Sequence, residues 1–122
     1  MPPVTLYPIT NLTLINEGNN LSHIVLESIK QTVGVNEGDI LVIAQKVVSK
    51  AEGAVVDLST ITPSDRAREI AERTGRDPRL CQVYLNEAAE ILEIKGRMVI
   101  TRHRLGFILS NSGLDRSNVA SH

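Results

Sequence analysis

Residues 62–78 read TPSDRAREIAERTGRDP, and this stretch contains the start and end signals of a helix. Thr62 can cap the helix, Pro63 suits its first turn, and Asp65 places an acid at the third position. Gly75 ends the helix, because glycine adopts the left-handed conformation of a helix end at little cost. The stretch therefore predicts one complete helix.

A second helix and three strands are expected to follow. Asp77-Pro78 opens the helix by the same logic, and we expect it to run to about Ala89. Cys81 falls within the apolar pattern of this helix and is expected to be a small core residue. Gly96-Arg97 is the expected turn between the first two strands. The three segments typical of strands are Ile91 to Ile94, Met98 to Thr101 and Phe107 to Leu109.

The N-terminal part of the chain contains a different signal. Ile40 to Ala44 is a continuous apolar run rich in branched residues, which is typical of a strand buried on both faces. Val4 to Tyr7 and Val55-Val56 read as further short strands. Ser22 is expected to cap a helix that Gly34 ends.

The order of these elements indicates the fold class. The helices cluster between groups of strands and do not alternate strictly with them, which favours an α+β fold over a doubly wound sheet. The chain has 122 residues, the size of one ordinary domain, and 42% of them are apolar. We therefore predict a single domain over residues 1–122, in which helices pack on a mixed sheet.

Composition excludes several classes of function. The formal net charge is −1, so no excess of charge attracts nucleic acid or an anionic membrane, and three aromatic residues make a poor platform for bases. No apolar run approaches the roughly twenty residues that span a bilayer. The single cysteine and the absence of signal-peptide features predict a cytoplasmic protein.

The segment from Ser49 to Gly53 follows the expected buried strand and is a candidate phosphate site. The ammonium group of Lys50 can lie against phosphate oxygens as a compact positive charge, and Ser49 can donate a further hydrogen bond. Gly53 permits a tight turn. A solvated surface turn is the alternative interpretation, and the residues alone favour it.

The segment from Asn111 to Asn118 is a candidate metal and nucleotide site. Asp115 offers a hard oxygen ligand suited to Mg²⁺ or Mn²⁺, and Asn118 can exchange hydrogen bonds with a nucleotide. One carboxylate does not make a metal site, however. The alternative is a turn in which Asp115 caps the following segment, and the residues alone again favour this alternative.

His103 lies between Arg102 and Arg104 at the end of an expected strand. A histidine there can act as an acid or base or contact an anion. A solvated hairpin tip is the more common structure for such a cluster.

Three blocks of the sequence resemble the coenzyme F-420:L-glutamate ligase family. The first is GDILVIAQKVVSKAEG, residues 38–53. The second is LSTITPSDRA, residues 58–67, followed by TGRDPR, residues 74–79. The third runs from HRLGF, residues 103–107, into NSGLDRSNV, residues 111–119. The blocks occur in family order and cover most of the chain.

The resemblance implies an amide ligase. In this family, GTP phosphorylates the carboxylate of the glutamate-free coenzyme, and the amine of L-glutamate attacks the resulting acyl phosphate to release GDP and phosphate. Mg²⁺ or Mn²⁺ assists the reaction, and K⁺ is a further candidate ion. The intact proteins of the family are homodimers.

The resemblance also implies roles for particular residues. Asp115 would be a metal ligand and Asn118 would contact the nucleotide. Lys50 and Gln45 would lie along the nucleotide site. An early loop would line the same site, with Thr10, Asn11, Leu12 and Thr13.

Two departures from the family pattern affect this interpretation. Ser112 and Leu114 stand where we expect Ala and Ile or Val in many relatives. Family members are also considerably longer, so we interpret the chain as the N-terminal half of a larger ligase fold and expect it to be inactive alone. A non-catalytic nucleotide-binding or dimerisation domain is the alternative.

Overall fold

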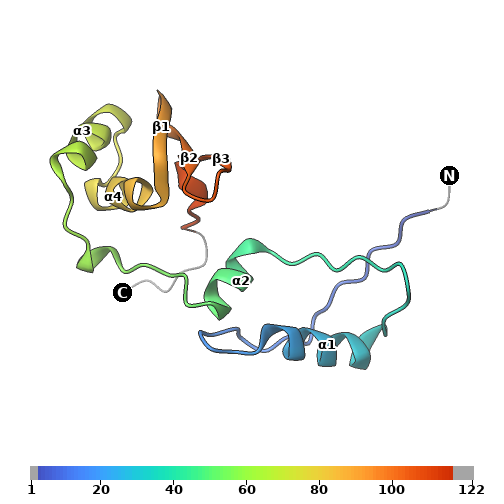
Figure 1. The fold of residues 1–122 in the computed structure, drawn as a ribbon. Coiled ribbons are helices and arrows are strands. Elements are labelled where there is room, and N and C mark those ends of the chain that lie inside the picture. The colour runs from blue at the N-terminus through green and yellow to red at the C-terminus, as the bar shows by residue number, and fades with distance from the viewer. Residues whose placement is uncertain (1–2, 117–122) are drawn as a thin grey trace. The chain divides into compact units, whose positions relative to one another are not determined.

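The structure is a computed structural model that describes residues 3–116. The chain divides into two compact units, Met1–Val56 and Asp57–His122, and each is described by itself. The first contains α1 (Leu21–Thr32) and α2 (Gln45–Ala51). The second contains η1 (Leu58–Thr60), α3 (Asp65–Thr74), α4 (Pro78–Glu87), β1 (Ala88–Lys95), β2 (Met98–His103), β3 (Ile108–Ser110) and η2 (Asn111–Gly113), as labelled where space allows in Figure 1. The single domain expected from the sequence stays a prediction.

The predicted helix after residue 20 is confirmed, with a different cap. The side chain of Asn20, not that of Ser22, accepts the His23 N–H at 3.0 Å. Asparagine is among the best residues for the N-cap position, and Asn20 lies directly before the first helical residue, Leu21. The end is as expected, because Gly34 takes a φ of +73° and donates its N–H to the Ile29 carbonyl at 2.9 Å.

The strands predicted in the first unit are wrong. Within residues 3–56 the structure has no strand at Val4 to Tyr7, Ile40 to Ala44 or Val55-Val56. Ile40 and Val42 are 88% and 85% exposed, so the apolar run is not buried either. A strand needs a neighbour that accepts its N–H groups, and this part of the chain offers none. An apolar run indicates side chains whose burial would be favourable, but it does not show that a partner strand is present.

The helix pair of the second unit follows its sequence signals closely. The side chain of Ser64 caps α3 by accepting the Ala67 N–H at 3.3 Å, so the cap lies two residues after the expected Thr62. Gly75 ends α3 with a φ of +65°. Asp77 caps α4, which ends at Glu87 and not at Ala89, because β1 starts directly afterwards.

The second unit contains a three-stranded antiparallel sheet in the order β1-β2-β3. All three predicted strands are present, and the turn at Gly96-Arg97 joins the first two. A register shift lies between Ile91 and Glu93. Such a bulge allows Ile91 and Ile94, three residues apart, both to pack against the core. The α+β prediction is confirmed, although the described sheet is antiparallel and not mixed.

α3 and α4 pack against the sheet and close one hydrophobic core (Figure 1). Val99 of β2 is fully buried at its centre. Cys81 is also fully buried, as predicted, and burial raises the pKa of its thiol. The buried cluster consists of Ala67, Ile70, Ala71, Leu80, Cys81, Tyr84 and Val99. Truncating a residue such as Ile70 to alanine costs about 2–5 kcal/mol in cores of this kind.

We predict that Asp77→Ala lowers the free energy of unfolding by about 1 kcal/mol, because the Arg79 N–H at the start of α4 loses its acceptor. The hydrogen bond from the Arg79 side chain also lowers the pKa of Asp77 from 3.8 to about 2. The carboxylate therefore stabilises the fold above about pH 4, and this contribution is lost as the pH falls toward 2.

Urea unfolding at pH 7 and at pH 3 measures both effects. Asp77→Asn is the matched control, since asparagine keeps the cap but carries no charge. The control should keep most of the stability at pH 7 and lose the pH dependence that Asp77 supplies. An equal loss in both variants at pH 7 would contradict the cap.

Candidate functional site

Lys50 lies in the last turn of α2, where a tight turn fixes the backbone beside it. Gly53 takes a φ of +67° and donates its N–H to the Lys50 carbonyl at 3.2 Å. Ala54 donates to the Ser49 carbonyl at 2.8 Å. The prediction that Gly53 supplies a tight turn is confirmed. A lysine at a helix C-terminus also interacts favourably with the helix dipole, so this position is stable without any ligand.

A polar loop is attached to the same end of α2. Gly18, in the loop between Asn16 and Asn20, donates its N–H to the Ala51 carbonyl at 3.1 Å. Lys50 is half-buried, and none of the ion pairs within residues 3–116 involves its ammonium. The group therefore remains available to an anion.

The early loop predicted to line the nucleotide site is exposed from Thr10 to Thr13. Asn11 within it donates its side-chain N–H to the Gln31 side chain of α1 at 3.3 Å. Leu12 is 39% exposed. Gln45 is exposed at the first position of α2 and already takes part in an interaction. The first unit thus carries the loop, Gln45 and Lys50.

Asp115 follows a left-handed turn in the second unit. Asn111, Ser112 and Gly113 take φ values of +52°, +53° and +73°. This conformation costs roughly 1–2 kcal/mol for a residue with a side chain, and asparagine tolerates it best after glycine. Ser112 is not a residue that adopts it readily, so neighbouring groups must hold the turn in place.

Buried hydrogen bonds hold this turn. Ser112 donates its N–H to Thr101 Oγ1 at 3.1 Å and its hydroxyl to the Tyr84 carbonyl at 2.8 Å. Thr101 is fully buried and Ser112 is 5% exposed. Asn111 Oδ1 accepts the Val99 N–H at 3.1 Å. β2 and the end of α4 thereby fix the turn on two sides.

Asp115 is the first exposed residue after this anchor. Leu114 packs against the core and donates its N–H to the Asn111 carbonyl at 3.1 Å. Asp115 is exposed and takes part in an interaction of its own. Between residues 3 and 116 no three His, Cys, Asp or Glu side chains gather as a metal site would require. Asp115 fits a divalent cation as one oxygen ligand among others.

Two parts of the predicted site stay predictions. Asn118 lies outside the described residues. Lys50 belongs to the first unit and Asp115 to the second. That both residues bind the same nucleotide therefore stays a prediction.

His103 takes part in a charged cluster at the end of β2. Its Nδ1 accepts the Leu105 N–H at 3.1 Å, so Nε2 carries the proton that it shares with Glu87 Oε2 at 3.2 Å. The guanidinium of Arg104 lies 2.8 Å from the same carboxylate oxygen. Arg102 pairs instead with Glu90 at 3.5 Å. This geometry favours a structural role for His103, because its Nε2–H already donates a hydrogen bond to Glu87.

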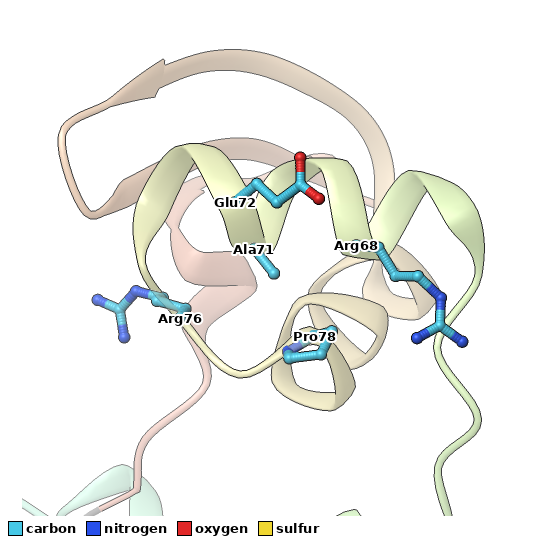
Figure 2. Close-up of a pocket in the computed structure, with 5 residues that line it drawn as sticks. All are labelled: Arg68, Ala71, Glu72, Arg76 and Pro78. Atoms are coloured by element: carbon cyan, nitrogen blue, oxygen red, sulfur yellow. The ribbon is translucent and has the colours of Figure 1, made fainter.

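A shallow depression between α3 and α4 is lined by arginines that sequence reasoning did not select (Figure 2). Arg68 and Arg76 stand at its two ends and point outward, and Glu72 lies on α3 between them. Each arginine donates to a backbone carbonyl, Arg76 to Arg97 at 2.7 Å and Arg68 to Pro63 at 3.2 Å. Diverging guanidinium groups separated by a carboxylate make a poor anion site.

Comparison with known proteins identifies the family. The model described as F420-0:Gamma-glutamyl ligase matches residues 10–122. The chain belongs to this family. It is similar to the coenzyme F420:L-glutamate ligase of Methanothermobacter thermautotrophicus, with 36% identity over 95% of this chain and 46% of the relative.

Two further relatives carry the same name. The ligase of Methanopyrus kandleri is 40% identical over 97% of this chain and 45% of its own length. That of Methanocaldococcus jannaschii is 46% identical over 70% of this chain and 34% of its own length. The chain therefore spans about half the length, or less, of these curated relatives. Within the described residues, no helix is both long and apolar enough to cross a bilayer.

Sequence reasoning missed the residues that hold Asp115 in place. Thr101 appeared only as the end of an expected strand, and Tyr84, whose carbonyl accepts the Ser112 hydroxyl, only fell within an expected helix. The one available signal was Asn111-Ser112-Gly113, since Asn and Gly adopt positive φ more readily than other residues. A hydrogen bond across eleven residues of sequence, such as that between Ser112 and Thr101, has no local signature.

We predict that Gly53→Ala destabilises the turn beside Lys50 by about 1–2 kcal/mol, because an L side chain resists this left-handed conformation. An added Cβ would also lie 2.5 Å from the Glu17 carboxylate oxygen. Urea unfolding followed by circular dichroism measures the loss.

Gly18→Ala is the matched control for the clash. Its φ is +77°, yet no atom lies within 4 Å of an added Cβ, so only the backbone strain remains. Unchanged stability in Gly53→Ala would contradict the left-handed turn after α2.

Proposed function

We propose that the chain forms part of a GTP-dependent ligase that adds L-glutamate to the glutamate-free form of coenzyme F420. The observation that carries the proposal is the family match over residues 10–122, which includes all three sequence blocks. The similar proteins are named as ligases of coenzyme F420 and L-glutamate. The glutamate-free coenzyme, L-glutamate and GTP are accordingly the proposed substrates.

The proposed reaction passes through an acyl phosphate. A carboxylate oxygen of the coenzyme attacks the terminal phosphorus of GTP, and GDP leaves with the electron pair of the broken bond. The amine of L-glutamate then attacks the acyl carbon, loses a proton, and expels phosphate as the amide forms. Mg²⁺ or Mn²⁺, when bound, supplies positive charge against the phosphate oxygens. K⁺ and a homodimer of the intact protein remain part of the proposal.

The residues of this chain would bind and orient the nucleotide. The ammonium of Lys50 has no ion-pair partner within residues 3–116 and suits a phosphate oxygen. Asp115 presents an exposed carboxylate at the end of a rigid turn, which suits a divalent cation. The loop from Thr10 to Thr13, Gln45 and Asn118 would complete the nucleotide contacts. The exposed side chains of the loop and of Gln45 are compatible with this role.

We predict that the polypeptide of residues 1–122 does not release GDP when it is supplied with GTP, Mn²⁺, glutamate-free coenzyme F420 and L-glutamate. The curated relatives are about twice as long, and no three-ligand metal cluster occurs within residues 3–116. A coupled assay for GDP measures turnover. Sustained release that depends on both acceptor substrates would overturn the prediction of inactivity, and it would support the ligase assignment.

We predict that Lys50→Met weakens GTP binding about tenfold in an active polypeptide that contains residues 1–122, a loss of roughly 1.4 kcal/mol for one charge-assisted contact. Lys46→Met is the matched control. Lys46 lies one turn earlier in α2, carries the same charge and is also half-buried.

Competition against a fluorescent GTP analogue gives both affinities. The control should change affinity less than about threefold, because only general electrostatic attraction is lost. Equal losses of GTP affinity in the two variants would mean that Lys50 acts only through general electrostatic attraction. Unchanged affinity in both variants would mean that Lys50 does not bind the nucleotide.

A further inference from the structure

The turn before Asp115 has an unusual backbone conformation. Asn111 and Ser112 are the non-glycine residues with positive φ in the described chain. Strained backbone of this kind persists where surrounding groups hold it, and it is commonly found at functional sites.

We propose that Thr101 and Asn111 are positioning residues for Asp115. They fix the left-handed turn that directly precedes it. The inference rests on the proposed function, in which Asp115 is a ligand of Mg²⁺ or Mn²⁺. It adds that the orientation of this ligand is set from the buried face of the sheet.

The hydroxyl of Thr101 connects two points of the chain. It donates to the Leu109 carbonyl of β3 at 3.2 Å and accepts the Ser112 N–H at 3.1 Å. Thr101 is fully buried, so water cannot replace either partner. The strand β3 and the turn that follows it are therefore fixed to the same atom of β2.

Asn111 fixes the turn from the other end. β3 pairs with β2 only as far as Ser110, opposite Ile100. Beyond that point, Asn111 Oδ1 accepts the Val99 N–H at 3.1 Å and so replaces the missing strand partner. Asparagine also tolerates the left-handed conformation that this bond requires.

These two anchors fix the chain as far as Leu114, directly before Asp115. The Leu114 N–H bonds to the Asn111 carbonyl at 3.1 Å, and the Leu114 side chain packs against the core. The chain reaches the surface at Asp115. A ligand presented in one orientation binds a cation more tightly than one that must be ordered first, and groups that orient metal ligands typically contribute 10–100-fold in affinity.

The test is a titration, with Mn²⁺ in the presence of GTP, of an active polypeptide that contains residues 1–122. Paramagnetic broadening of the amide NMR signals of Leu114 and Asp115 reports binding of the metal ion. We expect Thr101→Val and Asn111→Ala each to require about tenfold more Mn²⁺ for half-maximal broadening. Valine has the shape of threonine but cannot accept the Ser112 N–H. Unfolding curves of the same samples show whether each variant is fully folded under the conditions of the titration.

A control variant separates positioning from packing. Thr101→Ser keeps the hydroxyl that accepts the Ser112 N–H and donates to the Leu109 carbonyl. It should stay within about threefold of the unsubstituted protein. Ser112→Gly added to Thr101→Val should recover part of the loss, because glycine adopts positive φ without help.

Each outcome decides between the two levels of the proposal. If Asp115→Asn leaves the Mn²⁺ broadening unchanged, or if the unsubstituted protein shows none, the metal-ligand role fails and this inference fails with it. If Asp115→Asn abolishes the broadening but folded Thr101→Val and Asn111→Ala do not weaken it, only the positioning role is overturned. If Thr101→Val does not fold, Asn111→Ala decides alone, because Asn111 lies outside the buried core.

Discussion

The packing of α3 and α4 against β2 is the interaction on which the described second unit depends. Val99 and Thr101 are both fully buried and lie two residues apart, so they point to the same face of β2. Val99 completes the hydrophobic cluster beneath the helices. Thr101 offers a hydroxyl on the same face, and this hydroxyl accepts the Ser112 N–H. One face of one strand therefore stabilises the core and also supports the turn that leads to Asp115.

The two units differ in how much of their apolar surface they bury. The second encloses a contiguous core of seven buried residues. Between residues 3 and 56 only Ile15, Val25 and Ser28 are buried, while Val4, Leu6 and Ile40 are more than 85% exposed. Apolar surface stabilises a fold by about 25 cal/mol for each Å² that is buried, so these side chains contribute nothing as they stand.

The two residues proposed to bind the nucleotide and its metal ion, Lys50 and Asp115, differ in how freely they can move. Lys50 has four methylene groups between its ammonium and the fixed end of α2, so it can follow a phosphate through small changes of position. Asp115 is short, and the backbone before it is fixed by buried hydrogen bonds. This difference suits the two ligands, because a divalent cation demands defined oxygen geometry whereas a phosphate accepts a point charge from several directions.

Local sequence signals were sufficient to predict the α-helices and strands of the second unit. The caps at Asp77 and Gly75 depend on neighbouring residues, so their signals were readable within ±2 positions. Asp115 was a candidate because its carboxylate is a hard oxygen ligand and because the block around it resembles the ligase family. The absence of a strand at Ile40 to Ala44 could not be predicted, because an apolar run carries no information about whether a partner strand is present. The contact between Thr101 and Ser112 could not be predicted from local signals, because it joins positions eleven residues apart through the packing of β2, β3 and α4.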